Sequence, residues 1–233
     1  MSTPILKKIH SLCLCLLFIQ PIFALSNKSS HNLLIINSYN EQAAWSNSII
    51  VPIMQEVGKM SNTSAYVSHL HSILIKNDSL YQHSVNTLFQ RYENTKPHSV
   101  VLIGNMAFTL RDRIKEEWGD IPIILCAGRD SYTSPRYNYP EYESAEIPKD
   151  SIFSISGLKD KYNFTFILCP TYCKETIDMM IKIQPGIKTF IFAADKLFIN
   201  RIHEKEIKSY LSSSYPNIEY KRIYPNSNPA VPN

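Results

Sequence analysis

The chain has 233 residues, 44% of them hydrophobic and 19% charged, which is the composition of an ordinary globular protein that can bury a core. This length suits one large domain or two smaller lobes, and no segment has the composition of a disordered chain. The net charge is only +4, and it falls to +2 if residues 1–26 are removed, because they contain Lys7 and Lys8 and no acidic residue; so small a charge does not indicate binding to nucleic acid or to a membrane surface.

Residues 1–26 have the three parts of a secretory signal peptide. Lys7 and Lys8 form a basic start, the apolar run IHSLCLCLLFIQPIFA follows, and small residues stand near its end at Ala24 and Ser26. An uncleaved membrane anchor is the alternative, but a histidine, a glutamine and a proline leave an apolar stretch well below the roughly 20 residues that span a bilayer. We therefore expect export to the periplasmic or cell-surface side of the cytoplasmic membrane, with cleavage favoured over anchoring.

Short apolar runs and amphipathic segments alternate in residues 27–162, the predicted first lobe. The run NLLIINS is almost continuously apolar, as expected of a strand buried on both faces. The predicted strands cover residues 32–38, 64–70, 99–105 and 121–128. The predicted helices cover residues 45–60, 78–95 and 107–118. Strands and helices that alternate at this spacing indicate an α/β fold with a mostly parallel, doubly wound sheet.

Residues 131–150 interrupt the alternation with three prolines and four tyrosines, which predicts a long loop or a linker. The segment SIFSIS that follows is expected to close the sheet of the first lobe. The alternation then resumes in residues 163–224, the predicted second lobe. Its predicted strands cover residues 163–169, 188–195 and 218–224, and its predicted helices cover residues 173–183 and 198–214. Three strands make a small sheet, so we expect this lobe to be incomplete, with an unstructured tail at residues 225–233.

Two aromatic residues stand at the most informative strand end. In open α/β sheets, ligands bind beyond the carboxyl ends of the strands. Tyr39 and Trp45 lie where the first strand passes into the first helix, so they are candidates for the wall of a cleft that holds a small polar solute. Packing of Trp45 as a hydrophobic cap over the start of the helix is an equally good interpretation. Gly104 and Asn105 follow a buried strand in the same way, although a tight turn is the commoner reason for such a pair.

The sequence contains no motif of nucleotide chemistry or hydrolysis. There is no G-x-x-x-x-G-K-[ST], G-x-G-x-x-G, G-x-S-x-G or H-E-x-x-H. His69 and His71 would share one face of a predicted strand, but such a pair without a further ligand is usually structural. Cys126, Cys169 and Cys173 remain after the signal, an odd number, and the last two are expected to be partly buried thiols or, in an exported protein, a local disulfide. We therefore expect no catalysis, no metal and no cofactor.

Three blocks of sequence together carry a resemblance to a known family. They are LLIINSYNEQAAWSNSIIVPI, SVVLIGNMAFTLRDRIKEEWGDIPIILCAG and YNFTFILCPTYCKETIDMMIKIQPGIKTFIFAAD. Over residues 31–224, the chain resembles the extracytoplasmic sensor region of bacterial membrane-bound histidine kinases, in the group related to ABC-transporter substrate-binding proteins of the type I periplasmic-binding fold. The resemblance implies two Rossmann-like lobes, the second incomplete here, that close on a small solute and signal through a following transmembrane helix to a cytoplasmic kinase. The kinase domains are not contained in this chain, so we expect it to have no enzymatic activity of its own.

The resemblance also implies which residues surround the cleft, as geometric candidates. The first lobe would contribute Ser38, Tyr39, Asn40, Trp45, Gly104, Asn105 and Gly128, and the second lobe Tyr172 and Asp195. The expected partner is a small-molecule solute, and a homodimer is compatible with the family.

Three other functions are compatible with the sequence. The first is a soluble substrate-binding component that delivers solute to an ABC transporter. The second is an enzyme on the same scaffold, which would require a nucleophile and a base that the sequence does not show. The third is a truncated product without function, which would melt without cooperativity because its core is not complete.

Overall fold

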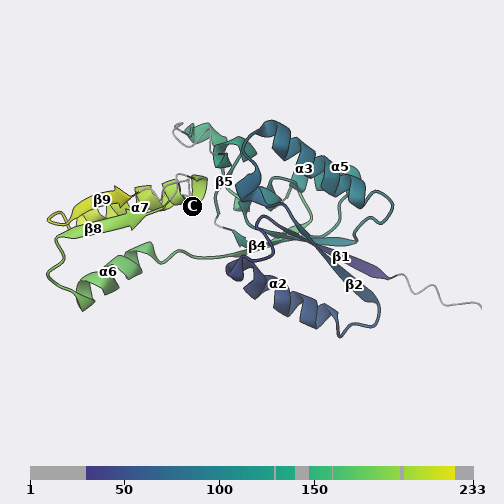
Figure 1. The fold of residues 1–233 in the computed structure, drawn as a ribbon, viewed down its shortest axis with the longest axis horizontal. Coiled ribbons are helices and arrows are strands. Elements are labelled where there is room, and N and C mark those ends of the chain that lie inside the picture. The colour runs from purple at the N-terminus through teal and green to yellow at the C-terminus, as the bar shows by residue number, and fades with distance from the viewer. Residues whose placement is uncertain (1–29, 129, 140–146, 159, 195–196, 224–233) are drawn as a thin grey trace, which may run out of the picture.

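The computed structural model describes residues 30–128, 130–139, 147–158, 160–194 and 197–223. The predicted signal peptide at residues 1–26, the candidate Asp195 and the predicted tail at residues 225–233 lie outside these ranges. Two lobes stand side by side, and an extended segment passes from one to the other (Figure 1). None of the helices within the described ranges combines the length and the apolar character that crossing a bilayer requires.

The first lobe contains a five-stranded sheet in which every neighbouring pair is parallel. In spatial order the strands are β2 (Thr63–His69), β1 (His31–Asn37), β3 (Ser99–Ile103), β4 (Ile123–Gly128) and β7 (Phe164–Leu168). The first strand in the sequence therefore lies inside the sheet, and the chain winds outward from it in both directions. This order confirms the predicted α/β fold with a parallel, doubly wound sheet.

Helices cover the two faces of this sheet. Figure 1 shows α3 (Asp78–Arg91) and α5 (Arg111–Trp118) on one face and α2 (Ala44–Val57) on the other. Side chains of β1 alternate between the two layers: Leu34 and Ile36 join the core under α3 and α5, whereas Leu33 and Ile35 join the core under α2. Both faces of β1 are buried, which explains its nearly continuous apolar sequence.

The helix that the sequence predicts at residues 107–118 is two helices in the structure. They are α4 (Asn105–Phe108) and α5, and they are separated at Thr109 and Leu110. Both the backbone N–H and the side-chain hydroxyl of Thr109 donate to the carbonyl of Met106, at 3.2 and 2.6 Å. A threonine side chain that occupies a backbone carbonyl in this way competes with continued helical bonding, which accounts for the break.

Two predictions about the end of the first lobe are wrong. The segment SIFSIS does not close the main sheet, because β6 (Ile152–Phe153) pairs antiparallel with β5 (Tyr132–Thr133) from the preceding loop. The segment 163–169, assigned to the second lobe, instead supplies β7 at the edge of the first sheet, with Ile123 opposite Phe164. Parallel pairing with β7 gives hydrogen-bond partners to the open edge of β4 and partly buries Phe164. The chain therefore crosses to the second lobe after this strand and not before it.

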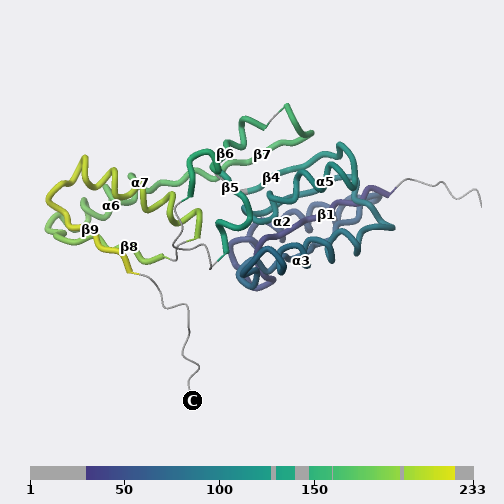
Figure 2. The backbone as a smooth tube through the Cα atoms, turned by 90° about the horizontal axis from the view of Figure 1, so that it is seen from above, coloured from purple at the N-terminus to yellow at the C-terminus, as the bar shows by residue number. Residues whose placement is uncertain are grey.

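The second lobe is a small βα unit (Figure 2). Its elements are α6 (Cys173–Ile183), β8 (Thr189–Ala193), α7 (Phe198–Ser214) and β9 (Glu219–Ile223), and its two strands pair in parallel. Its core gathers Ile177 of α6 with Ile207 and Leu211 of α7. The other face of the two-stranded sheet is open, with Ile191 and Ile223 about half exposed, at 54% and 51%.

Candidate ligand-binding cleft

A pocket of about 170 Å³ lies between the two lobes, beyond the carboxyl ends of β1 and β3. Both lobes and the crossover segment contribute to its wall. The lining residues are Tyr39, Trp45, Gly104 and Asn105 from the first lobe, Cys169 and Thr171 from the crossover, and Ile199 and His203 from α7. The pocket therefore occupies the place where ligands bind in open α/β sheets.

A buried polar network fixes the loop that carries Tyr39 and Trp45. Asn37, the last residue of β1, is fully buried and donates from Nδ2 to Oγ of Ser46 at 3.1 Å. The same Nδ2 lies 3.0 Å from Nδ1 of His69, and the Asn37 Oδ1 accepts the backbone N–H of Tyr39 at 3.3 Å. Three elements are thus tied to one amide, which gives the strand-to-helix turn a defined conformation.

The two aromatic rings of this turn form one wall of the pocket. The rings of Tyr39 and Trp45 meet edge to face, with centroids 5.5 Å apart and an interplanar angle of 80°. Trp45 remains 44% exposed, so it is not buried as a hydrophobic cap over the helix. Shielding by surrounding atoms raises the pKa of the Tyr39 hydroxyl further above neutral pH, where a tyrosine is protonated and can donate a hydrogen bond.

Gly104 allows the ring of Tyr39 to approach the backbone closely. It has φ +83°, and a Cβ at this position would lie 2.8 Å from Oγ of Ser38 and 3.0 Å from Cε2 of Tyr39. Ser38 itself points away from the pocket, because its buried hydroxyl donates to the carbonyl of Ile103 at 2.7 Å and accepts the N–H of Ala107 at 2.9 Å. Gly104 and Ser38 therefore hold β1, β3 and α4 together behind the aromatic wall.

No protein-family model matches the sequence, and no curated protein matches it either. Among solved structures, the chain is similar to a protein described as a LacI transcriptional regulator from Bacteroides fragilis, at 12% identity and a TM-score of 0.52, over 84% of this chain and 60% of that one. It is similar to a conserved domain protein from Vibrio cholerae at 10% identity and the same TM-score, over 84% and 57% of the two chains. An ABC-transporter solute-binding protein from Conexibacter woesei superposes less well, with a TM-score of 0.41 at 11% identity over 84% and 54%.

The chain has a fold of the LacI and type I periplasmic-binding-protein class. It spans less than two thirds of the length of each of these solved structures. At 10–12% identity, the similarity concerns the fold alone.

Within this periplasmic-binding-protein fold, four of the nine predicted residues line one pocket: Tyr39, Trp45, Gly104 and Asn105. Four others do not line it. Ser38 is buried, Asn40 accepts the N–H of Gln42 in a local turn at 3.1 Å, Gly128 ends β4 where the register with β7 shifts, and Tyr172 is 61% exposed before α6. Asp195, the ninth, lies outside the described residues.

Four lining residues are not among the nine predicted candidates. Cys169 and Thr171 lie within three positions of the end of β7, in the segment that the strand-end rule marks. Ile199 and His203 lie one turn apart on α7, and no local signal marks them, because only the placement of the second lobe brings that helix to the cleft.

The histidine pair of the sequence analysis does not lie on one strand face. β2 ends at His69, and His71 follows in a left-handed conformation with φ +50°. Nε2 of His71 lies 3.4 Å from a carboxylate oxygen of Glu41. No group of three or more His, Cys, Asp or Glu in the described part of the chain is placed to hold a metal ion, and no disulfide joins the cysteines there.

Proposed function

We propose that the chain recognises a small polar solute in the cleft between its lobes, as the extracytoplasmic sensor region of a two-component sensor histidine kinase. The pocket to which both lobes contribute carries this proposal. A solute in contact with Trp45 on one side and His203 on the other gains both sets of contacts only when the lobes are close together. Such a solute would bind the closed arrangement better and shift the population toward it.

The lining suggests the chemistry of the solute. It offers a phenol, an indole, a carboxamide, a hydroxyl and an imidazole, and none of the described residues that line it is a lysine, an arginine or a carboxylate. Hydrogen-bonding groups beside two aromatic rings suit a small polar solute with hydroxyl or amide groups. The proposal assigns recognition and no chemical conversion to this chain, so turnover of a bound solute would contradict it.

The direct test is a thermal-stability screen of the protein against a library of small polar metabolites. A solute that binds only the folded state should raise the melting midpoint with concentration. Trp45→Ala should raise the apparent Kd of such a solute at least tenfold, since a central aromatic contact is worth about 1.4 kcal/mol or more. Tyr66→Ala is the matched control, because Tyr66 is equally exposed at 44% but lies on β2 outside the pocket. Equal losses in both variants would refute the assignment.

The reading frame of the gene distinguishes the sensor from a transport component. A frame that continues into a transmembrane helix and a histidine kinase would support the sensor. A stop codon followed by permease genes would instead support a soluble substrate-binding protein, with the same cleft and the same solute chemistry.

A further inference from the structure

A second and larger cavity, of about 410 Å³, lies in the first lobe between the end of β2 and α3. The short 3-10 helix Ser72–Leu74 closes one side of it, and it shares no lining residue with the cleft between the lobes. Its volume is within the range of small-molecule sites, about 300–1,000 Å³. The proposed function of the cleft makes no use of this cavity.

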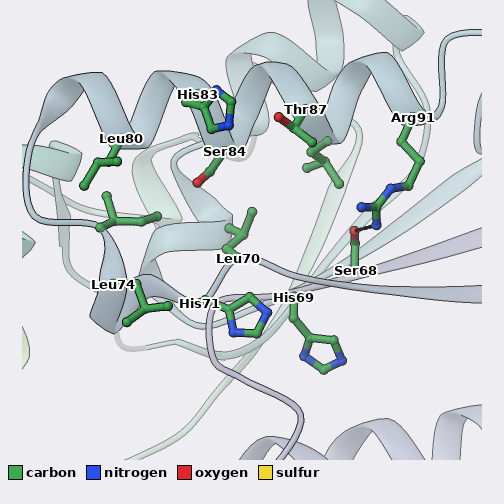
Figure 3. Close-up of a pocket in the computed structure, with 12 residues that line it drawn as sticks. Ser68, His69, Leu70, His71, Leu74, Leu80, His83, Ser84, Thr87 and Arg91 are labelled. Atoms are coloured by element: carbon green, nitrogen blue, oxygen red, sulfur yellow. Dashed lines mark hydrogen bonds between the residues drawn. The ribbon is translucent and has the colours of Figure 1, made fainter.

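One end of the cavity is cationic. Figure 3 shows Arg91 and Ser68 together at that end, with Thr87 one helical turn away on α3. The guanidinium of Arg91 donates a long hydrogen bond of 3.4 Å to Oγ of Ser68, which is 4% exposed. Among the described residues, no carboxylate lines the cavity and none lies within ion-pair distance of Arg91. The charge at this end is therefore open to an anion.

The other end of the cavity is mainly apolar, although His71 and His83 also line it. Leu70, Ile75 and Leu88 form a buried floor, with exposed fractions of 3–5%. Leu74 and Leu80 stand at the opposite end from Arg91 (Figure 3) and are strongly exposed, at 63% and 43%. Covering these two side chains would remove apolar surface from water, which favours the binding of an apolar chain.

We propose that this cavity binds an aliphatic carboxylate of medium chain length, with its carboxylate on Arg91 and its chain directed toward Leu74 and Leu80. An arginine can donate two parallel hydrogen bonds to a carboxylate, and such charge-assisted bonds are about twice as strong as neutral ones. Leu80 and Arg91 lie eleven positions apart on α3, or about 16 Å along the helix axis, so a chain held at Arg91 would run along the helix in the direction of Leu80.

Binding of octanoate to the protein, measured by calorimetry below the concentration at which octanoate self-associates, tests this site. Octanoate should bind with saturation, octanamide at least tenfold more weakly because it lacks the charge, and acetate without detectable heat because it lacks the chain. Arg91→Gln should weaken octanoate binding at least tenfold. Lys59→Gln is the control: Lys59 is exposed, pairs with Glu56 and does not line the cavity, so this change should leave octanoate binding unchanged.

The position of the bound chain gives a second readout. In methyl NMR spectra, octanoate should shift the resonances of the cavity floor, Leu70, Ile75 and Leu88, first. Equal affinity for octanoate and octanamide, unchanged affinity in Arg91→Gln, or shifts that gather instead at Ile199 in the cleft would each overturn the proposal. Because cleft binding is followed through Trp45 and this site through Arg91 and the leucines, failure of one proposal leaves the other standing.

Discussion

Gly104 illustrates how a single residue shapes the cleft, and Gly119 offers a matched comparison. Both have a positive φ, +83° and +85°, which costs any other residue about 1–3 kcal/mol. A Cβ at Gly119 meets nothing within 4 Å, whereas one at Gly104 collides with Ser38 and Tyr39. Gly104→Ala should therefore destabilise the protein by at least about 1 kcal/mol more than Gly119→Ala, as measured by urea unfolding. Equal losses would show that the close approach of Tyr39 is not a constraint.

Two asparagines on either side of the same turn differ in burial. Asn37 is fully buried and bonds to Ser46 and His69, whereas Asn40 only closes a local turn. Asn37→Ala leaves polar partners without a bond in a buried site, so we expect a loss of about 2–3 kcal/mol in the free energy of unfolding. Asn40→Ala should cost under about 1 kcal/mol. A smaller effect at Asn37 than at Asn40 would contradict the role given to the buried network.

At the scale of elements, one carboxylate connects α6 to α7. Asp178 accepts hydrogen bonds from the hydroxyls of Tyr210, at 2.7 and 2.9 Å, and Tyr215, at 2.7 Å. The hydrogen bond from Tyr215 makes the largest contribution to lowering the pKa of Asp178, and the bond from Tyr210 comes next. In turn, the bond to Asp178 raises the pKa of Tyr215 to about 12. The stabilisation from Asp178 is present above its unfolded pKa and is lost as the pH falls through its lowered folded pKa. The stabilisation from Tyr215 is fully present below pH 10.0, the ordinary pKa of a tyrosine, and is lost as the pH rises toward 12.

Replacement of Tyr215 by phenylalanine should remove this contribution. We expect Tyr215→Phe to melt at a lower temperature than the native protein at pH 8, and the difference to shrink as the pH is raised from 10 to 12, because the native protein loses the same bond there. Tyr66→Phe, on exposed β2, is the control and should follow the native curve. A constant difference across this range would mean that the Asp178 bond does not stabilise the lobe.

The elements show what local sequence determines and what it does not. The predicted ranges of α6 and α7 are confirmed to the residue, because each helix has an apolar stripe and ends at a recognisable break. The assignment of β7 failed because FTFIL fits the edge of either sheet, and only pairing with β4 decides between them. For the same reason, Tyr39 and Trp45 could be predicted from a strand end, whereas Ile199 and His203 depend on how the second lobe is placed.

At the scale of the whole molecule, export with cleavage of the signal peptide predicts a shortened N-terminus. If residues 1–26 are a cleaved signal peptide, the mature protein should begin near Asn27 and lack Lys7 and Lys8. Intact-mass spectrometry of the protein recovered from cells measures this directly. A recovered chain that still carries Lys7 and Lys8 would contradict cleavage.

The central claim is that a solute binds between the lobes against Trp45, and the chain has only two tryptophans to report on it. Trp45 lines the cleft, whereas Trp118 is 8% exposed and packs against Phe89 in the core. Fluorescence titration of Trp118→Phe and Trp45→Phe with a solute from the stability screen separates the two signals. We predict a saturable change in the emission of Trp118→Phe and none in Trp45→Phe. A change confined to Trp45→Phe would place the solute away from the cleft and contradict the account.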